Sequence, residues 1–163
     1  MLEAYHRHVQ ERAALDLPPL PLDAEQTAAI VQLLERPPPG AAHDLIDLLA
    51  RRVPPGVNPA ARLKAAFLTA VAGGTITSPA VDPGRAVELL GGMRGGFNLP
   101  PLLALLDHPV LAAAAAAQLA HTTLVFDALH EVASRARAGN PADATSHEAP
   151  ISRDRITPRL LAP

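Results

Sequence analysis

The side chains that could bind a metal ion or move a proton include seven histidines. His6 and His8 are two residues apart, so on a helix they point to different sides. His121 and His130 have no histidine four residues further on, and the segment that follows His43 lacks the second histidine and the glutamate of a zinc site. We therefore predict no metal site in this chain.

Other catalytic chemistry is also poorly represented. The chain has no cysteine, which excludes disulfides, thiolate nucleophiles and cysteine-ligated zinc or iron–sulfur clusters. Asp127 and Glu131 would share one helix face beside His130, where carboxylates could perturb each other, but a solvated polar face is the better explanation. No Gly-x-Ser-x-Gly nucleophile motif occurs. We predict no catalytic and no cofactor-binding residue, and we expect the chain not to be an enzyme.

Three segments resemble binding elements on first inspection. Gly91–Gly96 is glycine-rich like a phosphate loop, but it lacks the Gly-Lys-Ser/Thr ending, so we interpret it as a helix cap and connector. Pro18–Pro21 could bind a polyproline-recognising groove, although a linker between helices is the simpler interpretation. Pro109–Phe126 has no charged residue, but its alanines and polar residues favour a buried helix over a membrane span.

These segments lie between elements that are all predicted to be helical. Leu2, Tyr5 and Val9 recur at helical spacing, so an amphipathic helix opens the chain and ends before Pro18. The helix that ends before Pro54, which is the third along the chain, is marked by its leucines. Four further helices are predicted to begin at capping residues: Asp23 with Gln26 as its capping-box partner, Asn58 before Pro59, Asp82 before Pro83, and Asn98 before Pro100 and Pro101.

The apolar pattern predicts which side chains form the core. The helix after Asn58 is expected to bury Leu63, Phe67, Ala70 and Val71. The longest helix is expected to run from Pro109 to about Ala138. One face of it should carry Leu111, Ala115, Leu119, Thr122, Phe126, Leu129 and Ala133.

The order of these elements predicts an all-α fold. No segment has the alternation of a strand. Asp23, Asn58 and Asn98 each begin the first helix of a pair, at intervals of 35 and 40 residues, which is typical of a solenoid of antiparallel helix pairs. We predict about seven to eight helices, within a domain covering residues 1–139. Residues 140–163 are predicted to form a mostly disordered tail.

Composition supports one folded domain. Of the 163 residues, 48% are hydrophobic and 18% are charged, which favours folding over disorder. The net charge of -2 gives no attraction to nucleic acid or to an anionic membrane. The first residues lack the apolar stretch of a signal peptide, so we expect a cytoplasmic location and no membrane association.

Several short segments, in the same order, resemble the N-terminal domain of bacterial aconitase B, over roughly residues 1–142. They are Met1-Leu2-Glu3-Ala4-Tyr5, Pro21-Leu22-Asp23-Ala24, Arg52-Val53-Pro54-Pro55-Gly56-Val57, Glu88-Leu89-Leu90-Gly91, Gly95-Gly96-Phe97-Asn98 and His121-Thr122-Thr123-Leu124-Val125-Phe126-Asp127. Ala138-Gly139-Asn140 resembles the end of that domain's last long helix.

The resemblance implies a HEAT-like stack of antiparallel helix pairs. In full-length aconitase B this domain packs against the catalytic domains and helps to shape the route to the active site. It is also associated with dimerisation, and iron-dependent dimerisation is linked there to messenger RNA binding. The cluster cysteines, substrate-binding and catalytic residues of the family belong to a part that we expect to be missing from this chain, so no catalytic role transfers to its residues.

Three functional hypotheses follow. The first is a non-catalytic interaction module that binds itself or the catalytic domains of an aconitase, with Leu2, Tyr5 and Val9 as a candidate interaction surface. The second is a fragment of a citrate/isocitrate hydro-lyase of the tricarboxylic acid cycle. The third, an RNA-binding regulatory module, is the weakest, because no basic or aromatic stripe is visible.

Overall fold

The computed structural model describes residues 1–122, 130, 131, 133 and 134 of the chain. Every regular element in these residues is helical, which confirms the predicted all-α class. The elements are α1 (Leu2–Ala13), α2 (Ala24–Glu35), α3 (Ala42–Arg51), α4 (Pro59–Ala72), α5 (Pro83–Gly91), α6 (Leu99–Ala104), the short 3-10 helix η1 (Leu105–Asp107) and α7 (Ala112–Ala120).

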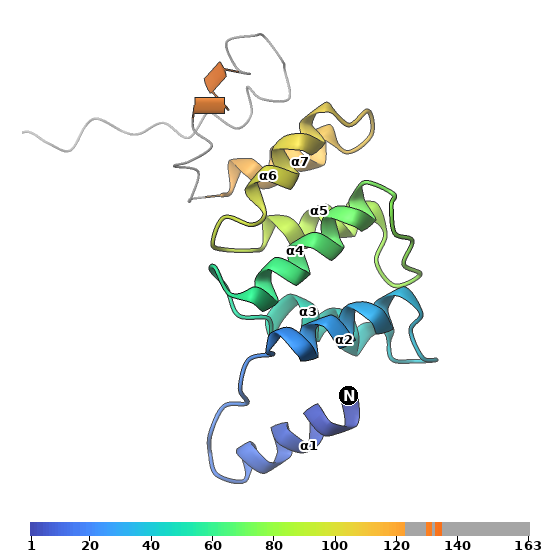
Figure 1. Cartoon of the computed structure of the whole chain (residues 1–163), viewed down its shortest axis with the longest axis vertical. Helices are drawn as coiled ribbons and strands as arrows, with labels where there is room; N and C mark the ends of the chain where they lie inside the picture. The colour runs from blue at the N-terminus through green and yellow to red at the C-terminus, as the bar shows by residue number, and fades with distance from the viewer. Residues whose placement is uncertain (123–129, 132, 135–163) are drawn as a thin grey trace, which may run out of the picture.

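The helices stack as pairs. Helix α2 packs on α3, α4 on α5, and α6 on α7, while α2 contacts α4 and α5 contacts α7 across successive pairs. In Figure 1 the connections within pairs lie along the right edge of the stack, and those between pairs lie along the left edge. The helices of a pair therefore run in opposite directions. This arrangement agrees with the predicted stack of antiparallel pairs, and its specifically HEAT-like geometry stays a prediction.

Two predicted caps explain where α2 and α4 begin. The Asp23 carboxylate accepts a hydrogen bond of 2.7 Å from the Gln26 amide, and the Gln26 side chain accepts one of 3.1 Å from the Asp23 amide. The predicted capping box is thus confirmed, and it satisfies two amides that the helix itself leaves without acceptors. Asn58 caps α4 by accepting a bond of 2.9 Å from the Ala60 amide.

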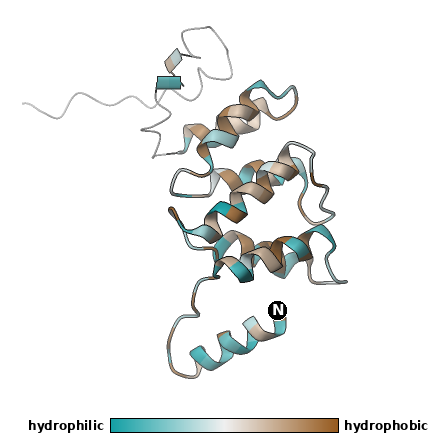
Figure 2. Ribbon diagram, in the orientation of Figure 1, coloured by the Kyte–Doolittle hydropathy of each residue, from teal (hydrophilic) through white to brown (hydrophobic). Residues whose placement is uncertain are grey.

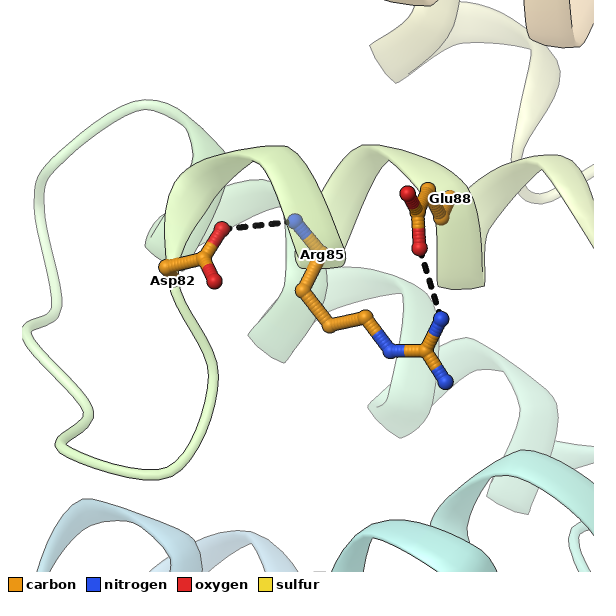
Figure 3. A network of polar contacts seen from close by, with 3 residues as sticks. All are labelled: Asp82, Arg85 and Glu88. Carbon is orange, nitrogen blue, oxygen red and sulfur yellow. Dashed lines mark hydrogen bonds and ion pairs between the residues drawn. The ribbon is translucent and has the colours of Figure 1, made fainter.

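Helix α5 begins in the same way. Asp82 accepts a hydrogen bond of 2.8 Å from the Arg85 amide, as Figure 3 shows. The Arg85 guanidinium forms an ion pair of 2.6 Å with Glu88, but both side chains are about half exposed, so solvent screens this pair. The cap, rather than the ion pair, fixes the start of the helix.

The predicted capping role of Asn98 is wrong. Helix α6 does begin at the next residue, but the Asn98 side chain makes no capping hydrogen bond. It is only 1% exposed, and its Nδ2 donates to the Met93 carbonyl at 3.3 Å. The buried side-chain amide of Asn98 lies inside the connection before α6. There it bonds to a backbone carbonyl of the loop instead of capping the helix.

The core consists almost entirely of aliphatic side chains from both helices of each pair. In the hydropathy colouring of Figure 2, hydrophobic residues recur along the stacked helices α2 to α7, whereas α1 is mostly hydrophilic. Phe67 and Val71 are buried as predicted, at 3% and 2% exposure. Leu63 is 37% exposed, so the prediction that α4 buries it is wrong. Residue 64 occupies the inward position of that turn instead, and it is a lysine.

The predicted long helix from Pro109 to about Ala138 is not continuous. Helix α7 begins at Ala112 and ends at Ala120, and Leu111, Ala115 and Leu119 are buried as predicted. The Thr122 amide and hydroxyl donate to the carbonyls of Leu119 and Gln118, both at 3.0 Å. These bonds satisfy acceptors that a helix end leaves free, so the chain closes the helix there.

Some predictions concern residues outside those that the structure describes. They include the predicted core residues Phe126 and Leu129, the carboxylate of Asp127, the domain boundary at residue 139 and the predicted disordered tail at 140–163. Within the described residues, no helix combines the length and the apolar character needed to cross a membrane.

Candidate functional site

The predicted interaction surface on α1 faces inward. Tyr5 is 3% exposed and belongs to the core cluster, and the half-buried Leu2 and Val9 pack against that cluster. Burial of Tyr5 leaves little of its side chain for another molecule. The apolar face of α1 therefore covers the body of this same chain.

Polar contacts through Arg52 hold α1 in that position. The Arg52 Nε donates to the Tyr5 hydroxyl at 2.8 Å, and the Tyr5 hydroxyl donates to the Leu20 carbonyl at 3.4 Å. The Arg52 Nη2 donates to the same carbonyl at 3.1 Å and also contacts the Pro19 carbonyl. The arginine after α3 thus ties the first helix and the proline-rich linker to the stack.

A more promising site lies where two connections between pairs meet. We call this region the loop edge: residues 53–57, between α3 and α4, and residues 92–98, between α5 and α6. The Gly56 amide donates to the Arg94 carbonyl at 2.8 Å. A Cβ atom on Gly95 would lie 2.2 Å from the Gly56 Cα, so the two backbones are in direct contact.

A pocket of about 250 Å³ opens beside this contact. Its lining comes from α3, from α4 and from both connections of the loop edge: Ala50, Val53, Pro54, Pro55, Ala61, Lys64, Gly92, Met93 and Arg94. Most of these side chains are apolar. Lys64 and Arg94 are the charged side chains among them, and both are cations at neutral pH.

Lys64 is the lone lysine of the chain and is 5% exposed. Its Nζ donates to the Ala50 carbonyl at 3.0 Å, in the last turn of α3, where a positive charge is favoured by the helix dipole. Burial removes water from the ammonium group and lowers the pKa of Lys64 to about 8. This lysine therefore changes charge close to neutral pH.

Sequence reasoning missed Lys64. One signal was available, since Lys64 lies three residues before Phe67 and four before Leu68, on the face that these side chains bury. A charged residue on a buried helix face is rare and marks a candidate site.

The glycine-rich segment Gly91–Gly96 forms one wall of a second hollow. Gly91 ends α5 and Gly92 caps it, which confirms the interpretation as helix cap and connector. The hollow measures about 500 Å³ and also includes Asn98, His121 and Thr122 in its lining. Arg94 borders both hollows.

The histidines and carboxylates do not converge in the described part of the chain. There, no three of the residue types that ligate metals lie close enough together to hold an ion. Lys64 and Arg94, by contrast, line one pocket, and donors on two cationic side chains can attract an anion.

Comparison with known proteins gives the same family throughout. The family model described as "Aconitate B N-terminal domain" matches residues 4–146. "Aconitate hydratase B" of Pseudomonas aeruginosa is 56% identical over 142 residues, which cover 87% of this chain and 16% of the relative. The Escherichia coli protein of that name is 53% identical over 140 residues, covering 86% of this chain and 16% of the relative.

A more distant relative carries the same name. "Aconitate hydratase B" of Helicobacter pylori is 36% identical over 138 residues, covering 83% of this chain and 16% of the relative. The chain thus spans about 16% of the length of these relatives.

These relatives correct one expectation. The classification of the chain as not an enzyme is wrong for its family, because every relative described above is named as a hydratase. The missing cysteines and catalytic motifs describe a segment that matches only a small part of those enzymes. The chain belongs to the family of the aconitate hydratase B N-terminal domain.

Proposed function

We propose that this chain is the N-terminal helical domain of an aconitate hydratase and that it works by packing against the rest of that enzyme. One observation carries the proposal: the chain is 56% identical to an aconitate hydratase B but spans 16% of it. The resemblance implies that the complete protein interconverts citrate and isocitrate. A stack of helix pairs suits the proposed role because it offers extended faces on which another domain can pack.

The loop edge is the proposed contact surface. Val57 is 84% exposed there, next to the point where the Gly56 amide bonds to the Arg94 carbonyl. An exposed apolar side chain on a fixed backbone loses little conformational entropy when a partner covers it. The nearby cations, Lys64 and Arg94, would contribute electrostatic complementarity to such a contact.

Binding to the remainder of a relative tests this proposal. The Pseudomonas aeruginosa enzyme without its matching region, shown to be folded by circular dichroism, is titrated with this chain in a calorimeter. We expect a one-to-one complex. The absence of a complex with the folded partner would contradict the proposed packing, and a complex between two copies of this chain alone would replace it with self-association.

A matched pair of variants tests the surface. Val57→Asp introduces a charge at the loop edge, whereas Val110→Asp introduces it at the connection before α7, where the valine is 79% exposed. We expect Val57→Asp to weaken binding by about tenfold or more and Val110→Asp to leave it unchanged. Equal effects of the two substitutions would exclude the loop edge as the contact.

A further inference from the structure

The pocket beside the loop edge combines two cations with an apolar wall. Its lining, described above, includes Lys64 and Arg94 but neither aspartate nor glutamate. Neither cation takes part in an ion pair within the described part of the chain. The pocket therefore has a net positive charge that no acidic group of its own lining neutralises.

Lys64 is the donor that stands out. A charged lysine has three N–H donors, and the Ala50 carbonyl at 3.0 Å accepts one of them. No other acceptor for its Nζ is found in residues 1–122. With the side chain 5% exposed, the remaining donors have little contact with water outside the pocket that the side chain lines. A buried cation with unused donors binds an anion favourably, because the anion restores the interactions lost on burial.

The apolar part of the pocket decides which anion fits. Val53, Pro54 and Met93 offer hydrocarbon contacts beside the two cations. A small inorganic anion would also interact with the cations, but it has no hydrocarbon part to place against these side chains. A carboxylate on a short carbon chain places its charge at the cations and its hydrocarbon against the wall. The volume of about 250 Å³ suits a group of that size.

We propose that this pocket is a carboxylate-binding site in which Lys64 and Arg94 together hold one carboxylate group. The carboxylate comes either from a small free acid or from an aspartate or glutamate side chain of another protein segment. The inference does not depend on the proposed packing against an enzyme, because the pocket is formed within this chain alone.

The single lysine allows a direct measurement. Protein labelled with ¹³C and ¹⁵N only in lysine gives one side-chain signal, that of Lys64. Its pKa is read from a pH titration of the Cε shift, alone and with acetate, with propane-1,2,3-tricarboxylate or with the blocked peptide Gly-Glu-Gly. Chloride at the same ionic strength controls for screening.

A bound carboxylate stabilises the charged lysine. We expect at least one of the three carboxylate probes to saturate the signal and to raise the pKa of Lys64 from about 8 by at least about one unit. Binding should weaken about fivefold to tenfold between pH 7 and pH 9, as Lys64 loses its proton. Saturation by the free acids identifies a small-molecule site, and saturation by the peptide alone identifies a site for an acidic side chain.

Two arginine variants provide the matched comparison. Arg94→Gln removes the second cation of the pocket, whereas Arg62→Gln removes an exposed cation from a separate hollow on the same helix as Lys64. We expect Arg94→Gln to weaken carboxylate binding by about tenfold and Arg62→Gln to leave it unchanged. Both variants retain the Lys64 signal, so folding and binding are followed in the same spectra.

A lysine with a purely structural role gives a different result. Its pKa would stay the same with all three carboxylates as with chloride, and this would overturn the proposal. Equal weakening by Arg94→Gln and Arg62→Gln would also overturn it, because the attraction would then be a general effect of charge. The proposed enzyme contact is tested separately by Val57→Asp, so the two ideas can fail independently.

Discussion

Gly56 and Gly95 touch through their backbones, although 39 residues separate them in the sequence. A Cβ atom on Gly95 would lie 2.2 Å from the Gly56 Cα, closer than any real side chain comes. The adjacent hydrogen bond from the Gly56 amide to the Arg94 carbonyl is 2.8 Å long. This contact joins the two connections of the loop edge and thereby shapes the pocket that contains Lys64.

Substitution of Gly95 should therefore disrupt the loop edge. Gly95→Ala adds a clash with the Gly56 backbone to the strain of a positive φ of 114°, whereas Gly74→Ala meets no atom within 4 Å at a φ of 73°. We expect Gly74→Ala to cost about 1–2 kcal/mol of unfolding free energy and Gly95→Ala at least about 1 kcal/mol more. Urea unfolding measures both, and equal costs would show that the loops separate without penalty.

Arg52 should control the attachment of α1. Arg52→Met removes the donors to the Tyr5 hydroxyl and to the Leu20 carbonyl, and we expect a cost of about 1.5–3 kcal/mol. Arg51→Met is the control, because Arg51 is 77% exposed in an ion pair with Asp47 and should change stability by less than about 0.5 kcal/mol. Hydrogen exchange should show loss of protection in α1 first, and unchanged protection there would contradict the anchoring role.

Truncation to alanine should cost very different amounts of unfolding free energy at two positions of α4 that lie one turn apart. Phe67 is 3% exposed and lies in the core, so Phe67→Ala should cost roughly 3–5 kcal/mol. Leu63 lies one turn earlier and is 37% exposed, so Leu63→Ala should cost less than about 1 kcal/mol. Both are measured by urea unfolding. Similar costs would mean that Leu63 is covered in solution, either by a second copy of the chain or by residues beyond 122.

Lys64 should make stability increase at alkaline pH. Its pKa is about 8 in the folded chain and 10.5 in the unfolded chain, so between these values the unfolded state binds more protons. The free energy of unfolding therefore rises with pH across this window, and below about pH 8 the buried charge costs roughly 3 kcal/mol.

The variant Lys64→Met isolates this effect. It removes the titrating group, so the stability of the variant relative to the original protein should be greatest near pH 7 and should decline toward pH 10. Urea unfolding of both proteins at several pH values gives the difference. A difference that stays constant over this range would show that Lys64 keeps its ordinary pKa.

The extent of each helix was predictable where local contacts fix it. Asp23 and Gln26 satisfy each other's amides within one turn, so the four residues from Asp23 to Gln26 are enough to locate the start of α2. The same holds for Asp82 before α5. The end of α7 was not predictable from periodicity, because the apolar spacing continues past Ala120 while Thr122 closes the helix.

By itself, the sequence determined the helical class and most helix starts, because capping and apolar periodicity act between residues a few positions apart. The family was identified from the resemblance of several short segments in the same order. Only the tertiary structure decided that Tyr5 faces inward under Arg52, that Lys64 rather than Leu63 is buried, and that Gly56 touches Gly95. Those outcomes depend on which helix faces meet when the pairs stack. That choice depends on the packing of the whole chain, so a single position gives at most a partial signal, as the helical spacing of Lys64 to Phe67 does.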